Sequence, residues 1–381
     1  MEELFNLQMG KTPSRNNSGY WNSQDNKWIS ISDLSKCGKY IFETKEYISN
    51  NAVEESGISL IPENTVVMSF KLSIGKVAIT SEPMYSNEAI MSFRDKGIVE
   101  LLPDYLYYLL LGQEWEQGTN KAVMGKTLNK ATLSQVKVRI HSIETQRSIV
   151  STLDKVTHTI DLCNAMLEKL DLLVKARFVE MFGDPILNTK GWEMTTIGEI
   201  VTEVKYGTSR PAIDGGKYAY LRMNNLTYDG YLDLADLKRI DIPDSEIEKC
   251  IVRKGDVLFN RTNSIELVGK TCVFDKDEDM IIAGYIIRVR LKPVMLPLIM
   301  SYFMNTDALK KKLRSMAKGA VNQANINAQE LKAIKIYLPP TDLQQQFADF
   351  VAQTDKSKLA VKQVLEKAET LKKALMQEYF G

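Results

Sequence analysis

Two long stretches of the chain carry apolar residues at alternating intervals of four and three positions. In the first stretch these residues are Ile149, Leu153, Val156, Ile160, Cys163, Leu167, Leu170 and Val174. The second stretch begins near Asp342 and is less regular, because Thr354 and Ser357 interrupt its apolar positions. Heptad spacing places apolar residues along one side of a helix, where a second helix can cover them. We predict two long helices that pair in antiparallel orientation. The alternative is that each helix packs only on its own domain.

Each long helix closes one copy of a repeated arrangement. The copies end at Phe182-Gly183 and Phe380-Gly381, and Leu102-Pro103 and Gly75-Lys76 match Leu296-Pro297 and Gly269-Lys270. Residues 135–140 and 333–338 both alternate like strands that lead into the helices. The offset between copies stays within 194–198 residues, which is far too long for a solenoid unit and indicates two domains. We therefore predict one domain at 1–143, a helix at 144–183, a second domain at 184–340 and a second helix at 341–381.

A loop rich in glycine, hydroxyl and basic residues opens each half. Backbone N–H groups, hydroxyls and a guanidinium together can bind phosphate groups. An ordinary surface turn would have the same composition. The candidate residues are Lys11, Thr12, Ser14 and Arg15 in the first half and Thr208, Ser209 and Arg210 in the second.

Residues 218–224 alternate as a half-buried strand would, and the outer face is expected to carry Tyr218, Tyr220, Arg222 and Asn224. Arginine to guanine and asparagine to adenine are favoured base contacts, so Tyr220, Arg222, Asn224 and Asn225 are candidates for reading DNA. In the same frame, Ser30 and Ser32 of the first half take the places of Arg222 and Asn224. Two domains that recognise different DNA sequences would differ at these outward positions. Random sequence change on a solvent-exposed face would produce the same difference.

Further polar segments extend the candidate site. The turn at 260–264 is dense in hydrogen-bonding groups, and the basic stretch 307–318 leads into a loop rich in asparagine and glutamine. A basic helix end followed by such a loop suits a phosphate backbone, although a solvated charged face is the alternative. The candidates are Arg261, Thr262, Lys318, Gln323 and Asn325 in the second half and Lys126 and Asn129 in the first.

Composition and missing motifs narrow the function. The 381 residues are 44% hydrophobic and 25% charged with a net charge of +1, which is ordinary for a globular protein of two domains. Four dispersed cysteines and two histidines do not form a disulfide scaffold or a histidine-rich metal site. No secretory signal or membrane span is recognised, so we expect a cytoplasmic protein. Each Gly-Lys-Thr lacks the earlier glycine of a phosphate-binding loop, and no catalytic motif is recognised.

The ordered, duplicated set of motifs resembles the specificity subunit of type I restriction–modification systems over essentially the whole chain. The motifs are the 10–15 loop, Gly319 with Gln323, Leu338-Pro-Pro340 with Gln344, and the two Phe-Gly helix ends. The resemblance implies an α+β fold with two repeated mixed α/β target-recognition domains separated by two long antiparallel coiled-coil helices. The first domain departs from it, because no leader equivalent to 188–196 precedes its loop.

The resemblance also implies a function. It implies a non-catalytic subunit whose domains each read one half of a bipartite double-stranded DNA site. Its helices would hold the domains at a fixed separation and dock two methyltransferase subunits, which restriction and translocation subunits would join. No cofactor is expected in this chain, because S-adenosylmethionine, ATP and Mg²⁺ would belong to the partners. Alternatives are an enzyme of unrecognised type, a coiled-coil protein scaffold, and a specificity subunit of a methylation-only or fused system.

Overall fold

The computed structural model describes residues 1–71, 73–115, 128–320 and 323–381. The chain divides into two compact units, each built from two stretches of sequence. Unit 1 comprises Met1–Asn164 and Gln363–Gly381, and unit 2 comprises Ala165–Lys362. The two long helices, α5 (Ile143–Phe182) and α11 (Thr341–Phe380), each contribute one portion to either unit.

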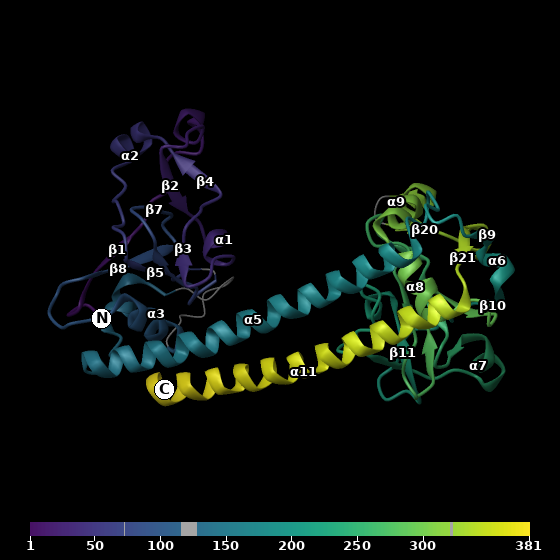
Figure 1. The fold of residues 1–381 in the computed structure, drawn as a ribbon. Helices are drawn as coiled ribbons and strands as arrows, with labels where there is room; N and C mark the ends of the chain where they lie inside the picture. Colours follow the sequence, from purple (N-terminus) through teal and green to yellow (C-terminus); the bar gives the residue numbers. More distant parts are fainter. Residues whose placement is uncertain (72, 116–127, 321–322) are drawn as a thin grey trace. The chain divides into compact units, whose positions relative to one another are not determined.

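Unit 1 contains eight strands and four short helices in its described residues, in addition to portions of α5 and α11 (Figure 1). The strands are β1 (Phe5–Met9), β2 (Asn26–Ile29), β3 (Tyr40–Ile41), β4 (Glu46–Ile48), β5 (Val66–Ser69), β6 (Val77–Thr80), β7 (Tyr85–Ser86) and β8 (Ile90–Asp95). The helices are α1 (Ile31–Leu34), α2 (Asn50–Ser56), α3 (Pro103–Leu111) and α4 (Lys130–Gln135), with a 3₁₀ turn, η1, at Ser18–Tyr20.

Unit 2 contains more elements in its described residues. The strands are β9 (Glu193–Thr196), β10 (Val201–Tyr206), β11 (Tyr218–Leu221), β12 (Lys238–Ile240), β13 (Ile251–Val252), β14 (Val257–Asn260), β15 (Thr262–Asn263), β16 (Thr271–Val273), β17 (Met280–Ile282), β18 (Ile286–Leu291), β19 (Lys318–Ala320), β20 (Gln323–Asn325) and β21 (Lys335–Leu338). The helices are α6 (Ile197–Ile200), α7 (Asp244–Cys250), α8 (Pro297–Asn305), α9 (Asp307–Met316) and α10 (Ala328–Lys332), with a 3₁₀ turn, η2, at Met223–Asn225.

Four strands of the main sheet follow the same order in both units, and β3 extends the sheet of unit 1 beyond them, so the predicted duplication is confirmed. The order β1-β8-β5-β6 in unit 1 corresponds to β10-β18-β14-β16 in unit 2. A second sheet in each unit has a central strand with one antiparallel and one parallel neighbour: β4-β2-β7 in unit 1 and β12-β11-β17 in unit 2. Both units are mixed α/β domains on one plan.

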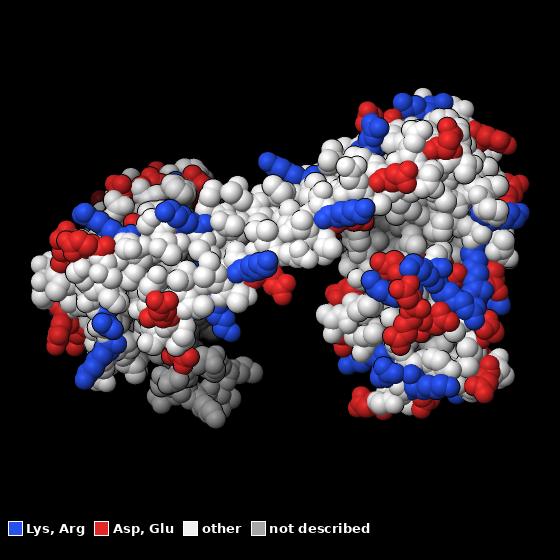
Figure 2. Space-filling view, turned by 60° about the horizontal axis from the view of Figure 1, so that its bottom comes forward, with Lys and Arg blue, Asp and Glu red and all other residues white. Residues whose placement is uncertain are grey.

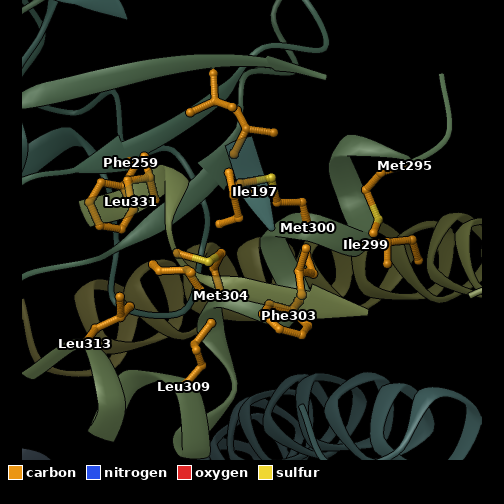
Figure 3. Packing of buried hydrophobic residues seen from close by; sticks show 14 of the residues in the cluster. Ile197, Phe259, Met295, Ile299, Met300, Phe303, Met304, Leu309, Leu313 and Leu331 are labelled. Carbon is orange, nitrogen blue, oxygen red and sulfur yellow. The ribbon is translucent and has the colours of Figure 1, made fainter. Parts of the chain in front are cut away.

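Apolar side chains from sheet and helix form the main core of unit 2. Ile299, Met300, Phe303 and Met304 of α8 lie in one buried cluster with Phe259 of β14 (Figure 3). Pro297 begins α8 at a position where a helix has no need of the backbone N–H, as Pro103 does for α3 in unit 1. The matched helix starts explain why Leu102-Pro103 and Leu296-Pro297 stand at corresponding places in the two copies.

Within each unit, portions of α5 and α11 lie side by side and antiparallel. In unit 2, Phe178 of α5 packs against Phe347 with ring centroids 5.4 Å apart, and Asp171 pairs with Lys358 at 2.6 Å. From the first contact to the second, the residue number falls in α5, from 178 to 171, and rises in α11, from 347 to 358. The two helices therefore run in opposite directions. In unit 1, Phe380 likewise packs against the core that contains Ile149. The helix pairing predicted from the heptad pattern is confirmed in each unit.

Two expected strands differ from the prediction. Residues 333–338 contain β21, which pairs with β9, but residues 136–140 form no strand, and no strand in the described part of unit 1 pairs with them as β9 pairs with β21. The strand expected over 218–224 ends at Leu221, because Asn225 bonds back to the Arg222 N–H and turns the chain into η2. Arg222 and Asn224 therefore lie beyond the strand. No described helix is long and apolar enough to span a bilayer.

Candidate nucleic-acid interface

The glycine-led loop of each unit is fixed on the end of a neighbouring strand. In unit 2 the Thr208 N–H donates to Ile282 O at 2.9 Å, and in unit 1 the Lys11 N–H donates to Ser86 O at 2.8 Å. A Cβ on Gly207 would collide with the carbonyl oxygens of Ile282 and Ala283, and one on Gly10 with that of Ser86. Glycine is needed at both positions because the backbones approach so closely. The two loops therefore occupy equivalent places in the fold.

An aromatic side chain from the central strand holds each loop. Tyr220 of β11 donates its hydroxyl hydrogen toward Arg210 O at 3.0 Å, and Trp28 of β2 donates from its indole nitrogen to Lys11 O at 3.1 Å. Tyr220 is 4% exposed, so the expectation that it faces outward with Arg222 was wrong. The loop itself covers that face of the strand. Burial also raises the pKa of the Tyr220 hydroxyl.

Each loop carries an arginine paired with a glutamate that comes later in the sequence. Arg210 meets Glu246 of α7 through two hydrogen bonds, of 3.2 Å from Nε and 2.7 Å from Nη2. Arg15 also donates two hydrogen bonds, from Nη1 and Nη2 to the two carboxylate oxygens of Glu46 of β4, and its guanidinium lies 3.6 Å from the ring centre of Trp21. The hydrogen bond from Arg210 lowers the pKa of Glu246, so the carboxylate stays charged at neutral pH. Neighbouring carboxylates thus compensate the charge of both loops.

Ser30 and Arg222 occupy matching positions, as the aligned frames predicted. Each follows its strand directly and is the N-cap residue of a short helical turn. The Ser30 N–H donates to Asp33 and the Arg222 N–H to Asn225, both at 2.8 Å. The backbone is therefore conserved between the units while the side chain at the cap differs.

A cavity of about 750 Å³ in unit 2 brings several separate predictions together. Residues from the loop, from the cap after β11 and from the turn after β14 meet in its lining. The candidates that line it are Thr208, Ser209, Arg210, Tyr220, Arg222, Asn224 and Arg261. Concave sites with a few converging polar groups are the usual form of a ligand site. The cavity is therefore the candidate interface of unit 2.

Two further candidates join the cavity through Arg261. Its Nη2 donates to Asn325 Oδ1 at 3.2 Å, and Asn325 Nδ2 donates to Thr262 Oγ1 at 3.1 Å. Thr262 and Asn325 face each other across strands β15 and β20, so the sheet β15-β20-β19 places them together. The polar turn and the asparagine loop, which are more than sixty residues apart in the sequence, form one surface.

The remaining candidates have other surroundings. Asn225 is buried and its amide donates to Asp233 O at 2.8 Å, which favours a structural role. Lys318 pairs with Glu330 at 2.6 Å, and Gln323 is exposed. In unit 1, Asn129 caps α4, Ser14 and Ser32 are exposed, and Thr12 donates to Glu88. Lys126 lies outside the described residues.

Sequence reasoning missed the partners that neutralise the candidate arginines. Arg222 donates to Asp236 at 2.7 Å, and hydrogen bonds from Lys238 and then from Arg222 lower the pKa of the Asp236 carboxyl. The face shown in Figure 2 likewise has basic and acidic side chains next to each other. Lys310 of the basic stretch is buried rather than exposed, because it lies over the ring of Tyr228 at 3.5 Å. No group of three metal-binding side chains was found among the described residues.

The two units repeat one α/β plan, and both contain portions of the same two long antiparallel helices. The structure is similar to that of a type I restriction–modification S subunit from M. genitalium, with a TM-score of 0.57, 13% identity, and coverage of 100% of this chain and 94% of that one. A chain solved in work on the assembly and conformational transition of a type I R-M system gives a TM-score of 0.64 at 16% identity, covering 100% of this chain and 96% of that one.

The family model for the type I restriction modification DNA specificity domain matches residues 1–172 and 189–370, and the chain belongs to this family. It is 27% identical over 262 residues, 62% of the chain, to the type I restriction enzyme MjaIX specificity subunit of Methanocaldococcus jannaschii, of which the match covers 59%. It is 23% identical over 242 residues, 59% of the chain, to the EcoKI specificity subunit of Escherichia coli, of which the match covers 52%. The chain thus matches little more than half the length of these relatives.

Proposed function

We propose that this chain is the DNA-binding specificity subunit of a type I restriction–modification complex. Each unit reads one part of a bipartite double-stranded DNA target. The observation that carries the proposal is the cavity of unit 2, where the loop, the cap and the polar turn converge. The equivalent loop of unit 1, with its own arginine and aromatic support, favours a second reader built on the same plan.

Differences at the equivalent caps support distinct half-sites. Arg222 stands where unit 1 has Ser30, on the same backbone. An arginine offers a planar fork of N–H donors and no acceptor. A serine hydroxyl can donate one hydrogen bond and can also accept hydrogen bonds. Two units with the same backbone but different side chains at this position would recognise different bases.

The long helices are proposed to dock the methyltransferase subunits. In unit 2, apolar residues of α5 and α11 remain on the surface although both helices already pack against the core, and Leu172 and Leu359 are 63% and 59% exposed. Apolar side chains of this size exposed along helices are typical of protein-interaction surfaces. S-adenosylmethionine, ATP and Mg²⁺ would be bound by the methyltransferase and restriction subunits, and the complex would act in the cytoplasm.

A binding experiment separates this proposal from a protein scaffold. The full chain is co-expressed and purified with a type I methyltransferase subunit of its host, and its binding to a duplex library is measured at rising salt. We expect co-purification, and an affinity for DNA that falls steeply with salt because phosphate contacts release counterions. A complex that forms but has no salt-dependent affinity for DNA would favour the scaffold. Cleavage or methylation by the chain alone would favour an enzyme.

A further inference from the structure

Arg261 differs from the other arginines of the unit 2 cavity in having no carboxylate partner. Arg210 is paired with Glu246 and Arg222 with Asp236. Across the described residues, no acidic side chain lies within ion-pair distance of Arg261. Its positive charge is therefore left for a ligand to compensate.

Neutral groups hold the Arg261 guanidinium in place. It donates from Nη1 to Gly284 O at 3.3 Å and from Nη2 to Asn325 Oδ1 at 3.2 Å, and it lies 4.8 Å from the ring centre of Tyr206. Its backbone is fixed as well, because its N–H donates to Tyr285 O at 2.9 Å and its carbonyl accepts from Ile326 at 2.9 Å. The side chain is thus positioned before any ligand arrives.

The donor groups of Arg261 are only partly used. A guanidinium has five N–H donors, of which two have the partners named above. Its Nε is shielded from solvent and has no partner within the part of the chain that the structure describes. The Nη groups keep further hydrogens for a ligand that offers acceptors. A fixed, charged and incompletely bonded fork in a cavity of about 750 Å³ indicates a recognition group.

We propose that Arg261 reads a guanine in the half of the DNA target that unit 2 recognises. Guanine presents two adjacent acceptors, O6 and N7, in the major groove, which match two N–H groups of one guanidinium. Adenine presents one acceptor and one donor there, cytosine a donor, and thymine one acceptor and a methyl group. This inference rests on the proposed function and adds a base and a residue to it.

The surroundings of Arg261 favour a base over a phosphate. Arg210 is exposed on a loop and its ion pair with Glu246 lies at the surface, where a phosphate would be able to take the place of the carboxylate. Arg261 is half-buried within the cavity and anchored at several points, so it cannot follow a phosphate that shifts. Fixed geometry is what discrimination between base edges needs.

The test uses the full chain with its methyltransferase partner in a host free of N6-methyladenine, and long-read sequencing reports the methylated motif. Three variants are compared with the wild type: Arg261→Ala, Arg261→Lys and Arg210→Ala. Lysine keeps the charge but lacks the planar fork. We expect both Arg261 variants to lose a guanine requirement at one position of one half-site, with discrimination there falling roughly 10- to 100-fold. Arg210→Ala should weaken methylation evenly across all sites.

The outcomes separate failure of the inference from failure of the proposed function. If the wild type methylates a bipartite motif and both Arg261 variants keep the full motif at lower efficiency, Arg261 contacts phosphate and the inference is wrong. If the wild type directs no bipartite methylation, the proposed function itself fails. Thermal melting of each variant shows whether the fold is intact. Arg261→Lys keeps the test decisive should Arg261→Ala not fold.

Discussion

Arg210 and Glu246 form a two-point ion pair in unit 2, and Arg15 and Glu46 form its counterpart in unit 1. Both arginines sit in the loops proposed to contact phosphate groups. In the free protein, the glutamate carboxylate therefore occupies the position at each arginine where a DNA phosphate is proposed to bind. We infer that the glutamate lowers non-specific attraction to DNA while the arginine stays in place.

This pairing predicts the effect of Glu246→Gln. Removing the charge while keeping the shape should release Arg210 and strengthen binding to non-specific duplex by roughly two- to five-fold at low salt, since an exposed ion pair contributes modestly. Fluorescence anisotropy at several salt concentrations measures the effect. Glu46→Gln is the matched variant in unit 1 and should act in the same direction. Weaker binding in both variants would show that the glutamates position the arginines for DNA.

The double variant Arg222→Ala with Asn224→Ala tests the assignment of unit 2 to one half-site. Both residues line the cavity. We expect one half of the methylated motif to lose definition, at about 1–3 kcal/mol for each lost bidentate base contact, while the other half stays unchanged. Ser32→Ala in unit 1 should leave the unit 2 half-site unaffected. Equal degradation of both halves by the double variant would mean that these side chains are structural.

Phe178→Ala tests the packing of the long helices in unit 2. The ring contacts Phe182, Tyr302 and Phe347, with centroids 5.0, 5.8 and 5.4 Å away. Truncation leaves a cavity in the core, and we expect a loss of about 3–5 kcal/mol in the free energy of unfolding. Urea denaturation measures it. The neighbouring Val179 is 50% exposed, so Val179→Ala should cost less than about 0.5 kcal/mol. Similar losses for both would contradict the described packing.

Lys310→Met should stabilise the protein in a pH-dependent manner. Burial lowers the pKa of Lys310 from 10.5 to about 8. Below pH 8 the lysine is charged in both the folded and the unfolded state, and the folded state bears the cost of burying the charge. Between pH 8 and 10.5 the folded state releases its proton first, so the cost declines as pH rises.

The gain in melting temperature from Lys310→Met should therefore be larger at pH 7 than at pH 10. Lys311, the next residue in α9, is exposed, and Lys311→Met should give no such trend. A gain that grows with pH, or a loss at pH 7, would show that the contact with Tyr228 outweighs the burial of charge.

The sequence predicts the long helices and the duplication well because both depend on patterns that persist over many residues. A heptad spacing sustained from Ile149 to Val174 leaves few alternatives to a paired helix. The strand ends were less predictable. A period of two continues through Arg222 and Asn224, but one hydrogen bond from the Arg222 N–H to Asn225 ends the strand at Leu221, three residues earlier than that pattern suggests.

The sequence predicted the segments of the candidate site one by one, but it did not predict that they form a single surface. The cap at Arg222 and the polar turn at Arg261 do meet, because β11 and β14 place them around one cavity. Their partners could not be predicted, since Glu246 and Asp236 look like ordinary exposed carboxylates in the sequence. The burial of Tyr220 was missed for a similar reason, because the loop that covers it is positioned by contacts of Gly207 and Thr208 with β17 and the residue after it.

The most direct test of the central claim is long-read mapping of N6-methyladenine in the host genome, with and without the gene for this chain. We predict a motif with two defined halves and a fixed unspecified gap, present in the wild type and lost on deletion. Methylation that is unchanged in the deletion strain would contradict the claim that this chain selects the DNA sites of the complex.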